Sequence, residues 1–295
     1  MNAENTTIDP ASVPYVTLNT DARIPQLGLG VFQIPPEDTE SVVATALASG
    51  YRSIDTAARY NNEAGVGAGI AASGLARDEV FVTTKLANDD QGYESAHAAF
   101  DRSLGELKLD AVDLYLIHWP APKRGEFLNC WRALEEIHAD GRARAIGVSN
   151  FLVHHLEKLL ENSSTVPAVN QIEVHPYLQQ KELRAFNASH GIRTEAYSPL
   201  AQGAVLRDPV ITGIAGRLQR SPAQVVLRWH IQLGNIVIPK SVTPQRIRSN
   251  IDVFDFELTD ADMAAIETLD RGERTGFHPD EFNGYPEEFA RLSKR

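Results

Sequence analysis

Four polar side chains of different chemistry lie at or just after the ends of apolar, strand-like runs. Asp55 falls near the end of "YRSIDTA", and Tyr60 follows five residues later in a loop. Lys85 closes the next run, "VFVTTKL", and His118 closes the one after it, "AVDLYLIH". A carboxylate, a phenol, an amine and an imidazole that lie together can transfer a proton to or from a substrate.

These side chains meet only if the strands that carry them are parallel neighbours, because the carboxyl ends of parallel strands form one rim of a barrel. From residue 26 onward, strand-like and helix-like segments alternate without a break. Eight strands, each followed by a helix, are the number that closes a parallel barrel. The sequence therefore predicts an α/β fold, a (β/α)8 TIM barrel.

The expected elements follow in chain order. The strands are 25–32, 51–57, 80–86, 111–119, 143–150, 167–174, 193–200 and 235–241. The helices between them are 37–49, 62–74, 91–108, 127–140, 152–162, 180–190 and 221–233, and the two extra helices are 208–218 and 259–269. Thr259 and Asp262 form a plausible capping pair for the last helix. Turn residues 19–22 between two short runs predict an N-terminal β-hairpin before the barrel.

The whole chain, 1–295, is expected to form a single domain, because barrels of this size commonly do. Residues 1–14 are polar and proline-containing, and we expect them to be flexible. Residues 271–295 contain too many aromatic side chains for a solvated tail, so we expect this segment to fold over the barrel, either as plain packing or as part of a pocket wall. The aromatic residues concerned are Phe277, Phe282, Tyr285 and Phe289.

Composition excludes several classes of partner. The net charge of −11, without a basic block, argues against a nucleic-acid or anionic-membrane surface. No apolar run approaches the roughly 18 residues of a membrane span. The single cysteine, Cys130, excludes an internal disulfide, and its helical context indicates a buried structural thiol rather than a nucleophile. We expect a cytoplasmic protein.

Two further patterns are weak. Gly67, Gly69 and Ala72 match the spacing of a dinucleotide fingerprint, but a polar loop separates them from the preceding strand, and they lie within a helical window. We expect instead that these small residues let the helix pack closely on the barrel. The histidines show neither the HExxH pattern nor paired Cys/His spacing, so we expect no catalytic metal.

A second group of polar residues lies in "IPKSVTPQRIRSN". Lys240 and Ser241 end the last expected strand, and Thr243 as the N-cap, followed by Pro244 at the first helical position, is a typical helix start. Backbone N–H groups at that helix start, together with Lys240 and Arg246, are expected to form an anion site.

Several motifs together resemble the aldo-keto reductase family, most closely its bacterial members that resemble diketogluconate reductases. They are "DTAARYNNE", "TTKL", "DLYLIHWP", "IGVSNF", "NQIEVHP", "YSPLAQG" and "IPKSVTPQRIRSN", in this order along nearly the whole chain. The resemblance implies a monomeric barrel that reduces aldehydes and ketones, including α-dicarbonyls or keto-sugars, with NADPH and without a metal.

The resemblance implies that Tyr60 is the proton donor, that Lys85 and Asp55 tune it, and that His118 orients the substrate carbonyl. A cation about 4 Å from a phenol, at an effective dielectric of ~20, favours the phenolate by roughly 4 kcal/mol. From a starting value of ~10, the pKa would fall by up to about 3 units, less any opposing desolvation. We expect Asp55 to keep Lys85 charged.

The resemblance also assigns cofactor contacts. Arg246 would bind the adenosine 2′-phosphate and Asn250 the adenine, which favours NADPH over NADH. Tyr197 would stack on the nicotinamide. The remaining expected contacts are the carboxamide partners Ser149, Asn150 and Gln171, the pyrophosphate neighbours Ser198, Leu200 and Gln202, and the backbone or hydroxyl contacts of Ile238, Lys240, Ser241 and Val242. A buried Asn or Gln could instead tie strands together.

Phe32 and Trp119 are expected to be walls of the substrate pocket, beside His118. The sequence departs from the family pattern at two positions. Ala87 stands where relatives commonly have Trp, so we expect a wider mouth that accepts bulkier carbonyls. Ser249 stands where the family often has Glu, which removes one adenine contact.

Two other function classes remain. A non-catalytic pyridine-nucleotide-binding subunit would keep "IPKSVTPQR" and lose part of the tetrad, whereas all four tetrad residues are present. A barrel aldolase would use Lys85 as a Schiff-base nucleophile, and the pairing of Tyr60 with His118 argues against it.

Overall fold

Eight parallel strands, in the part of the chain that the computed structural model describes (residues 8–285 and 288), form one curled sheet. The strands run in the order of the chain: β3 (Leu29–Gly30), β4 (Ser53–Asp55), β5 (Phe81–Leu86), β6 (Val112–Ile117), β7 (Ala143–Ser149), β8 (Val169–Glu173), β9 (Arg193–Tyr197) and β10 (Ile236–Val237). The residues just before β3 join the last strand: Leu27 forms a parallel bridge with Val237, and Gly28 N donates to Val237 O at 2.9 Å. The predicted barrel is confirmed.

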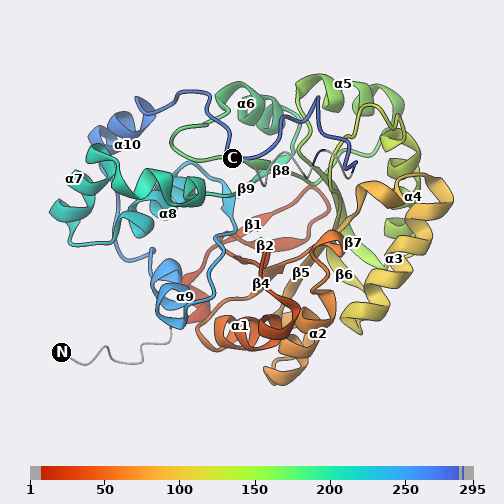
Figure 1. Ribbon diagram of the computed structural model, residues 1–295, viewed down its shortest axis with the longest axis horizontal. Helices are drawn as coiled ribbons and strands as arrows, with labels where there is room; N and C mark the ends of the chain where they lie inside the picture. Colours follow the sequence, from red (N-terminus) through yellow and green to blue (C-terminus); the bar gives the residue numbers. More distant parts are fainter. Residues whose placement is uncertain (1–7, 286–287, 289–295) are drawn as a thin grey trace.

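Helices surround the sheet as a ring (Figure 1). Those that follow successive strands are α1 (Pro36–Ala48), α2 (Glu63–Ala72), α3 (Tyr93–Leu107), α4 (Phe127–Ala139), α5 (Val153–Asn162), α6 (Lys181–Ser189), α8 (Pro222–Gln232) and α9 (Pro244–Ile251). The predicted extra helices are α7 (Pro209–Leu218) and α10 (Asp260–Glu267). The expected capping pair forms, since Asp262 N donates to Thr259 Oγ1 and Thr259 N to Asp262 Oδ2.

The first and last barrel strands are shorter than expected. Pro25 belongs to the hairpin, so only Leu29–Gly30 of the predicted 25–32 forms β3. At the other end, β10 stops at Val237, and Lys240 and Ser241 lie in the loop beyond it. Proline lacks the N–H that a ladder needs, so Pro239 prevents the strand from continuing.

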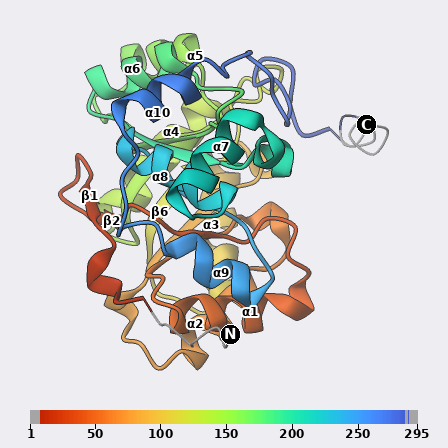
Figure 2. The same cartoon turned by 90° about the vertical axis from the view of Figure 1, so that its left-hand side faces the viewer.

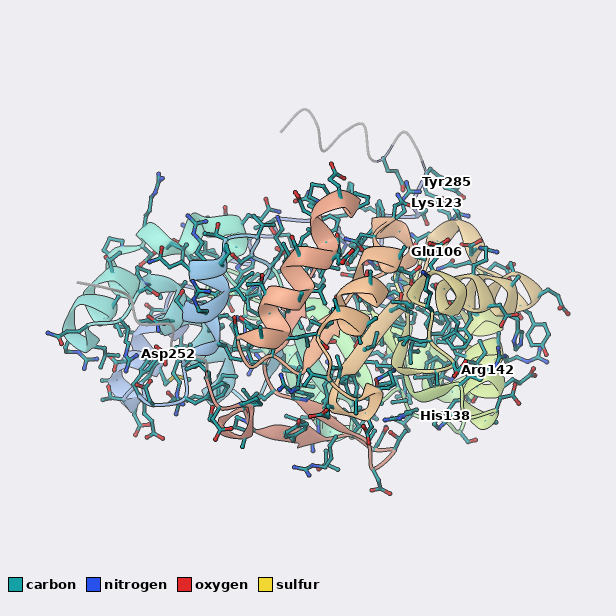
Figure 3. The ribbon with its side chains drawn as sticks, turned by 90° about the horizontal axis from the view of Figure 1, so that it is seen from below. Glu106, Lys123, His138, Arg142, Asp252 and Tyr285 are labelled. Atoms are coloured by element: carbon teal, nitrogen blue, oxygen red, sulfur yellow. The ribbon has the colours of Figure 1, made fainter. Side chains whose placement is uncertain are left out.

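The predicted N-terminal hairpin consists of β1 (Tyr15–Thr17) and β2 (Arg23–Pro25), which pair antiparallel. Ile24 packs into a cluster of inward-facing barrel residues that includes Leu114 and Val169. The hairpin therefore closes one end of the barrel, and the C-terminal segment lies at the other (Figure 2). Seen with side chains, Lys123 and Tyr285 lie at the end of the molecule away from the hairpin (Figure 3).

The two terminal segments lie only partly within the described residues. Residues 1–7, in the stretch expected to be flexible, and Phe289 lie outside them. Pro10–Ser12 form a 3-10 helix, and Val13 is buried. Residues 271–285 run across the carboxyl ends of the strands, where Phe277 and Phe282 line a cavity that is described below.

The glycines of α2 provide close contacts between helices rather than a nucleotide turn. A Cβ at Gly67 would lie 2.1 Å from the carbonyl oxygen of Leu107 on α3, and one at Gly69 would lie 2.7 Å from Cβ of Val43 on α1. Thus α2 approaches its neighbouring helices closely, whereas the sequence had suggested close packing on the barrel. No dinucleotide fingerprint is needed to explain the spacing.

Gly67→Ala should lower the free energy of unfolding by about 1–3 kcal/mol, because the new methyl group meets backbone that cannot move aside. Gly213→Ala on α7 is the matched control: nothing lies within 4 Å of its added Cβ, and alanine is the better helix former. Urea unfolding of both variants measures the difference. Equal stability of the two variants would contradict the close approach of α2 and α3.

Candidate active site

A buried ion pair forms the floor of the site. Lys85 Nζ donates to Asp55 Oδ1 at 2.7 Å and to the carbonyl oxygen of Thr56 at 2.8 Å. Asp55 is in register with Thr83 on β5, so Lys85, two residues further on, projects to the same face of the sheet. Burial lowers the pKa of Lys85, but the attraction of Asp55, Tyr60 and Glu195 and the hydrogen bond to Asp55 together outweigh it, and the net pKa is raised. Lys85 therefore stays charged although it is fully buried.

Tyr60 and His118 lie above this pair. Tyr60 ends a short 3-10 helix, Ala58–Tyr60, after β4, and the Lys85 ammonium lies 5.1 Å from the centre of its ring. His118 follows β6, and its ring meets that of Tyr60 edge-on at 5.6 Å. Phe32 also packs against Tyr60, with 5.0 Å between the ring centres. The four residues that the sequence singled out are thus brought together.

The pKa of Tyr60 differs in direction from the sequence expectation. Burial raises the pKa above that of an ordinary phenol, and the opposing effect of Lys85 is too small to reverse this. The expected net lowering is therefore wrong for this state of the site, because desolvation of the phenolate exceeds its attraction to the ammonium. Tyr60 carries its proton at neutral pH.

His118 has the opposite shift. Burial, followed by the charges of Lys85 and Arg59, lowers the pKa of His118 well below its usual range. A neutral imidazole therefore lies next to a protonated phenol. Such a pair can hydrogen-bond to an uncharged substrate oxygen without adding a second positive charge.

A cavity of about 630 Å³ opens over these side chains. Its lining includes most of the predicted site residues: Phe32, Asp55, Tyr60, His118, Trp119, Ser149, Asn150, Gln171, Tyr197, Ser198, Gln202, Ile238 and Lys240. Lys85 lies beneath the lining. Ala87 is buried and does not line the cavity, whereas its neighbours Asn88 and Asp89 do.

The amides at the strand ends are engaged within the protein. Asn150 Nδ2 donates to the carbonyl oxygen of His118 at 2.9 Å, and Asn150 Oδ1 accepts the hydroxyl of Tyr197 at 2.7 Å. Ser149 Oγ donates to the carbonyl oxygen of Gln171 at 2.9 Å. These bonds tie the neighbouring strands together, which is the alternative that the sequence had left open for such residues.

Helix α9 and the part of the preceding loop from Ser241 onward lie outside the cavity lining, whereas Ile238 and Lys240 of that loop belong to the lining. Leu200, Ser241, Val242, Arg246 and Asn250 do not line it. Ser241 and Asn250 are buried, whereas Val242 and Arg246 are exposed. Within the described residues, no carboxylate pairs with Lys240 or Arg246.

Helix α9 begins at Pro244, as predicted. The side chain of Thr243, however, makes no capping hydrogen bond; instead, its backbone N–H donates to Ser241 Oγ at 3.4 Å. The expected threonine cap is therefore wrong, and the first N–H groups of this eight-residue helix are not covered by that side chain.

The sequence did not reveal how the C-terminal segment is held. Glu173, the last residue of β8, is buried, and its carboxylate accepts the backbone N–H and the hydroxyl of Thr275, both at 2.6 Å, and the N–H of Gly276 at 3.2 Å. Burial raises the pKa of Glu173, but hydrogen bonds from His175 and Thr275 lower it below its usual value overall.

This anchor fixes an aromatic wall of the cavity. Phe277 follows the anchored residues and stacks on Phe282 at 4.2 Å between ring centres. Phe282 in turn meets Trp119 edge-on at 4.6 Å. Of the two roles proposed for this segment, the described residues favour that of a pocket wall.

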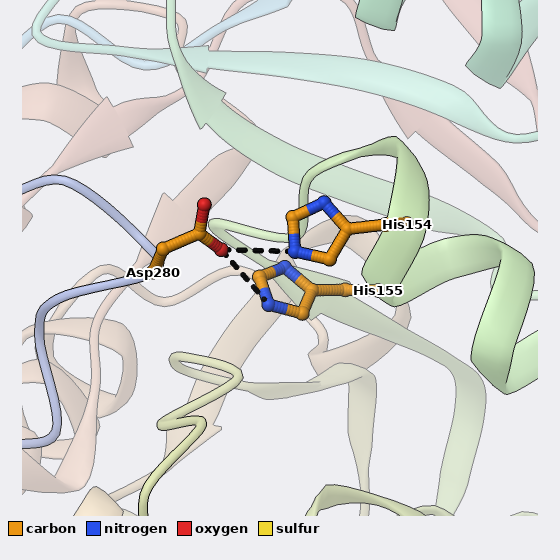
Figure 4. Close-up of side chains that lie close together, drawn as sticks. All are labelled: His154, His155 and Asp280. Carbon is orange, nitrogen blue, oxygen red and sulfur yellow. Dashed lines mark ion pairs between the residues drawn. The ribbon is translucent and has the colours of Figure 1, made fainter.

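A second contact joins the same segment to α5 (Figure 4). Asp280 Oδ1 lies 2.9 Å from His154 Nε2 and 3.3 Å from His155 Nε2. His155 Nδ1 accepts the N–H of Leu152 at 3.2 Å, so Nε2 carries the proton of the neutral ring and faces Asp280 as a donor. The arrangement therefore fits a hydrogen-bonded contact better than metal ligation.

Another carboxylate that the sequence did not reveal lies deeper in the barrel. Gln171 Nε2 donates both to Asp55 Oδ2 at 2.7 Å and to Glu195 Oε2 at 2.8 Å. Glu195 precedes Tyr197 by two residues on β9, so the two side chains project to the same face. The even spacing from Tyr197, a residue expected to face the cofactor, was the signal available in the sequence.

Comparison with known proteins identifies the family of the chain. The sequence profile of the Aldo/keto reductase family matches residues 26–271. The chain belongs to the aldo/keto reductase family.

Several relatives match this reductase over nearly their whole length. An aldo-keto reductase of Mycolicibacterium smegmatis is 57% identical over 270 residues, which are 92% of this chain and 98% of the relative. A morphine 6-dehydrogenase of Pseudomonas putida is 55% identical over 280 residues (90% and 94%). A glyoxal reductase of Bacillus subtilis is 53% identical over 268 residues (90% and 96%).

Solved structures of family members superpose closely on this reductase. A mutant of Gox0644 in complex with NADPH is 48% identical, with a TM-score of 0.88 over 92% of this chain and 98% of that one. An aldo-keto reductase of Bombyx mori in complex with NADP is 38% identical, with a TM-score of 0.86 over 93% and 98%.

Glu173→Gln should loosen the C-terminal wall. The amide turns an N–H₂ group toward at least one of the donors that the carboxylate now accepts, and hydrogen bonds to a charged group are worth about 1.5–3 kcal/mol each. Hydrogen exchange followed by mass spectrometry should show faster exchange in residues 271–285 and little change in the barrel strands.

Glu182→Gln on α6, an exposed position, is the control and should leave that exchange unchanged. Protonation of Glu173 should act like the substitution. Because its folded pKa is lowered, the anchor is fully present above the ordinary pKa of a glutamic acid and is lost as the pH falls through the folded value. Unaltered protection in the variant would rule out Glu173 as the anchor.

Proposed function

We propose that Tyr60 is the proton donor in an NADPH-dependent reduction of aldehydes and ketones to alcohols. The observation that carries this proposal is the position of a protonated phenol on the cavity lining, with its ring 5.1 Å from a buried ammonium. Family membership supplies the reaction class, since the chain is an oxidoreductase that acts on carbonyl groups.

Each member of the tetrad has a separate task. A carbonyl oxygen between Tyr60 and His118 would accept hydrogen bonds from both side chains, which orients it and polarises its carbon. As negative charge develops on that oxygen, Tyr60 transfers its proton to it. Lys85 then stabilises the phenolate that remains, and Asp55 holds Lys85 in its charged form until the phenol regains a proton from solvent.

The residues around the cavity fit a reduced pyridine nucleotide. Tyr197 on the cavity lining offers an aromatic face, and Lys240 on the lining and Arg246 on α9 offer cations that no described carboxylate neutralises. We assign Arg246 to the 2′-phosphate, Asn250 to the adenine, and Tyr197 to the nicotinamide. When bound, NADPH supplies the hydride for the carbonyl carbon. Gox0644 and the Bombyx mori enzyme have solved complexes with NADPH and NADP, respectively, which supports the same cofactor here.

The proposed substrate range follows from the aromatic side chains that line the cavity. Phe32, Trp119, Phe277 and Phe282 form an apolar surface that can hold a carbon skeleton without specifying its polar groups. Relatives at similar identity are named for glyoxal and for morphine, which differ greatly in size. We propose that this chain accepts both small α-dicarbonyls or keto-sugars and bulkier ketones.

The two alternative classes are disfavoured by particular contacts. A Schiff-base nucleophile must reach the substrate as a free amine, whereas Lys85 lies below the cavity lining, is bonded to Asp55 and Thr56, and has a raised pKa. A non-catalytic nucleotide-binding subunit has no need of an assembled proton donor. The tetrad is complete here.

We propose that the protein works as a monomer in the cytoplasm. Every site residue discussed above comes from one chain, which is sufficient for the reaction. The single thiol, Cys130, is buried. Within the described residues, no helix combines the length and the apolar character that crossing a membrane requires.

Tyr60→Phe should lower kcat by about 10²–10⁴-fold, the usual contribution of general acid catalysis, while NADPH binding stays near the wild-type level. The ring and its contact with Phe32 remain, and only the proton is lost. Rates of carbonyl reduction followed by NADPH absorbance, with cofactor binding by fluorescence, measure both effects. Tyr15→Phe on the hairpin is the control. A Tyr60→Phe enzyme with wild-type kcat would refute the assignment.

Arg246→Ala should weaken NADPH binding by about 10–100-fold and NADH binding much less, since a charged hydrogen bond to phosphate is worth about 1.5–3 kcal/mol. Arg248→Ala, two residues further along α9, is the matched control because residues two apart face different sides of a helix. Dissociation constants for both cofactors give the comparison. Equal losses for NADPH and NADH would show that Arg246 does not contact the 2′-phosphate.

A further inference from the structure

A chain of hydrogen bonds runs from the tetrad into the barrel and ends at Glu195. It passes from Lys85 to Asp55, from Asp55 to Gln171, and from Gln171 to Glu195, with distances of 2.7, 2.7 and 2.8 Å. Gln171 and Glu195 are register partners on β8 and β9, so their side chains project side by side. The roles proposed above make no use of Glu195.

Glu195 occupies an unusual environment. Its side chain is fully buried, and its Oε1 atom has no hydrogen-bond partner among the described residues. The charged groups that act on it are Asp55 of β4 and Lys85 of β5, and the cation is already bonded to Asp55. Burial and repulsion from Asp55 raise the pKa of Glu195 to about 8. It is therefore mostly protonated at neutral pH.

The position of Glu195 constrains Gln171. The amide nitrogen of Gln171 has two hydrogens, and each points to a different carboxyl group. These two hydrogen bonds fix the orientation of the amide: its nitrogen faces the two carboxyl groups and its oxygen faces away from them. None of the described residues donates a hydrogen bond to that oxygen. Removing either acceptor leaves one buried N–H without a partner and frees the amide to turn.

We propose that Glu195 is a positioning residue for the carbonyl reduction proposed above, which holds Gln171 against Asp55 and, once ionised, places a second negative charge near the tetrad. This inference rests on the proposed function. Glu195 would thus act in two ways: its hydrogen bond fixes the orientation of Gln171, and its charge changes the pKa of Tyr60 and Lys85.

The sign of the electrostatic effect follows from the site. A charge on Glu195 raises the pKa of both Tyr60 and Lys85. Reduction needs protonated Tyr60, so kcat/KM falls as the pH rises through the pKa of Tyr60. Ionised Glu195 therefore delays this fall to higher pH. Alcohol oxidation needs the phenolate, so its onset is delayed as well.

Glu195→Gln removes the charge and keeps an oxygen that can accept from Gln171. Two charges ~10 Å apart at an effective dielectric of ~20–40 shift each other's pKa by roughly 0.6–1.2 units. We expect the alkaline fall of kcat/KM for reduction, and the alkaline rise for oxidation, both to move to lower pH by about 0.5–1 unit. The dissociation constant of NADPH at pH 7 should stay within about twofold of wild type.

Glu195→Ala also removes the acceptor, and should show the same shift together with a lower kcat. Asp113→Asn is the matched control for disturbing a buried acid. Asp113 lies near the start of β6, at the hairpin end of the barrel, and pairs with Arg77 and Arg144. Its variant should lose stability and keep the wild-type pH profile.

Wild-type protein that lacks NADPH-linked carbonyl reduction would refute the proposed function, whatever Glu195 does. Active wild-type enzyme whose profile superposes on that of Glu195→Gln would overturn this inference alone.

Discussion

The arrangement of the site depends on one buried ion pair, Lys85 with Asp55. Removing an ammonium and a carboxylate from water costs several kcal/mol for each ion, and the attraction between them offsets this only when their geometry is good and their remaining bonds are made. Here Thr56 O and the amide of Gln171 complete those bonds. Three strands, β4, β5 and β8, must therefore keep their register, and the closed barrel enforces it.

Much of this fold could be predicted because its signals are local. Alternating apolar strands and amphipathic helices indicate a barrel, and polar residues at strand ends indicate its functional rim. Thr259 and Asp262 lie three residues apart, and their capping pair forms as the spacing predicts. Two predictions made from local signals are wrong. The strand β10 ends earlier than predicted, before Pro239, and Thr243 precedes helix α9 without capping it.

Contacts between distant residues could not be predicted in this way. Glu173 holds Thr275 and Gly276 about a hundred positions later, and nothing in either segment alone indicates the other. The direction of the pKa shift of Tyr60 could not be predicted from the sequence either. The sequence identifies the cation beside the phenol, but the depth of burial that outweighs this cation is a property of the assembled site.

The raised pKa of Tyr60 suits a proton donor better than a lowered one would at rest. A carbonyl oxygen is a weak base until hydride reaches the neighbouring carbon, and it then becomes a far stronger base than a phenolate. In the proposed reaction, a phenol that keeps its proton at neutral pH releases it only as that charge develops, and the ammonium of Lys85 would stabilise the anion left behind. Burial and the ion pair thus act at different stages. Burial keeps Tyr60 protonated before the reaction, and the ion pair lowers the free energy of the phenolate that proton transfer produces.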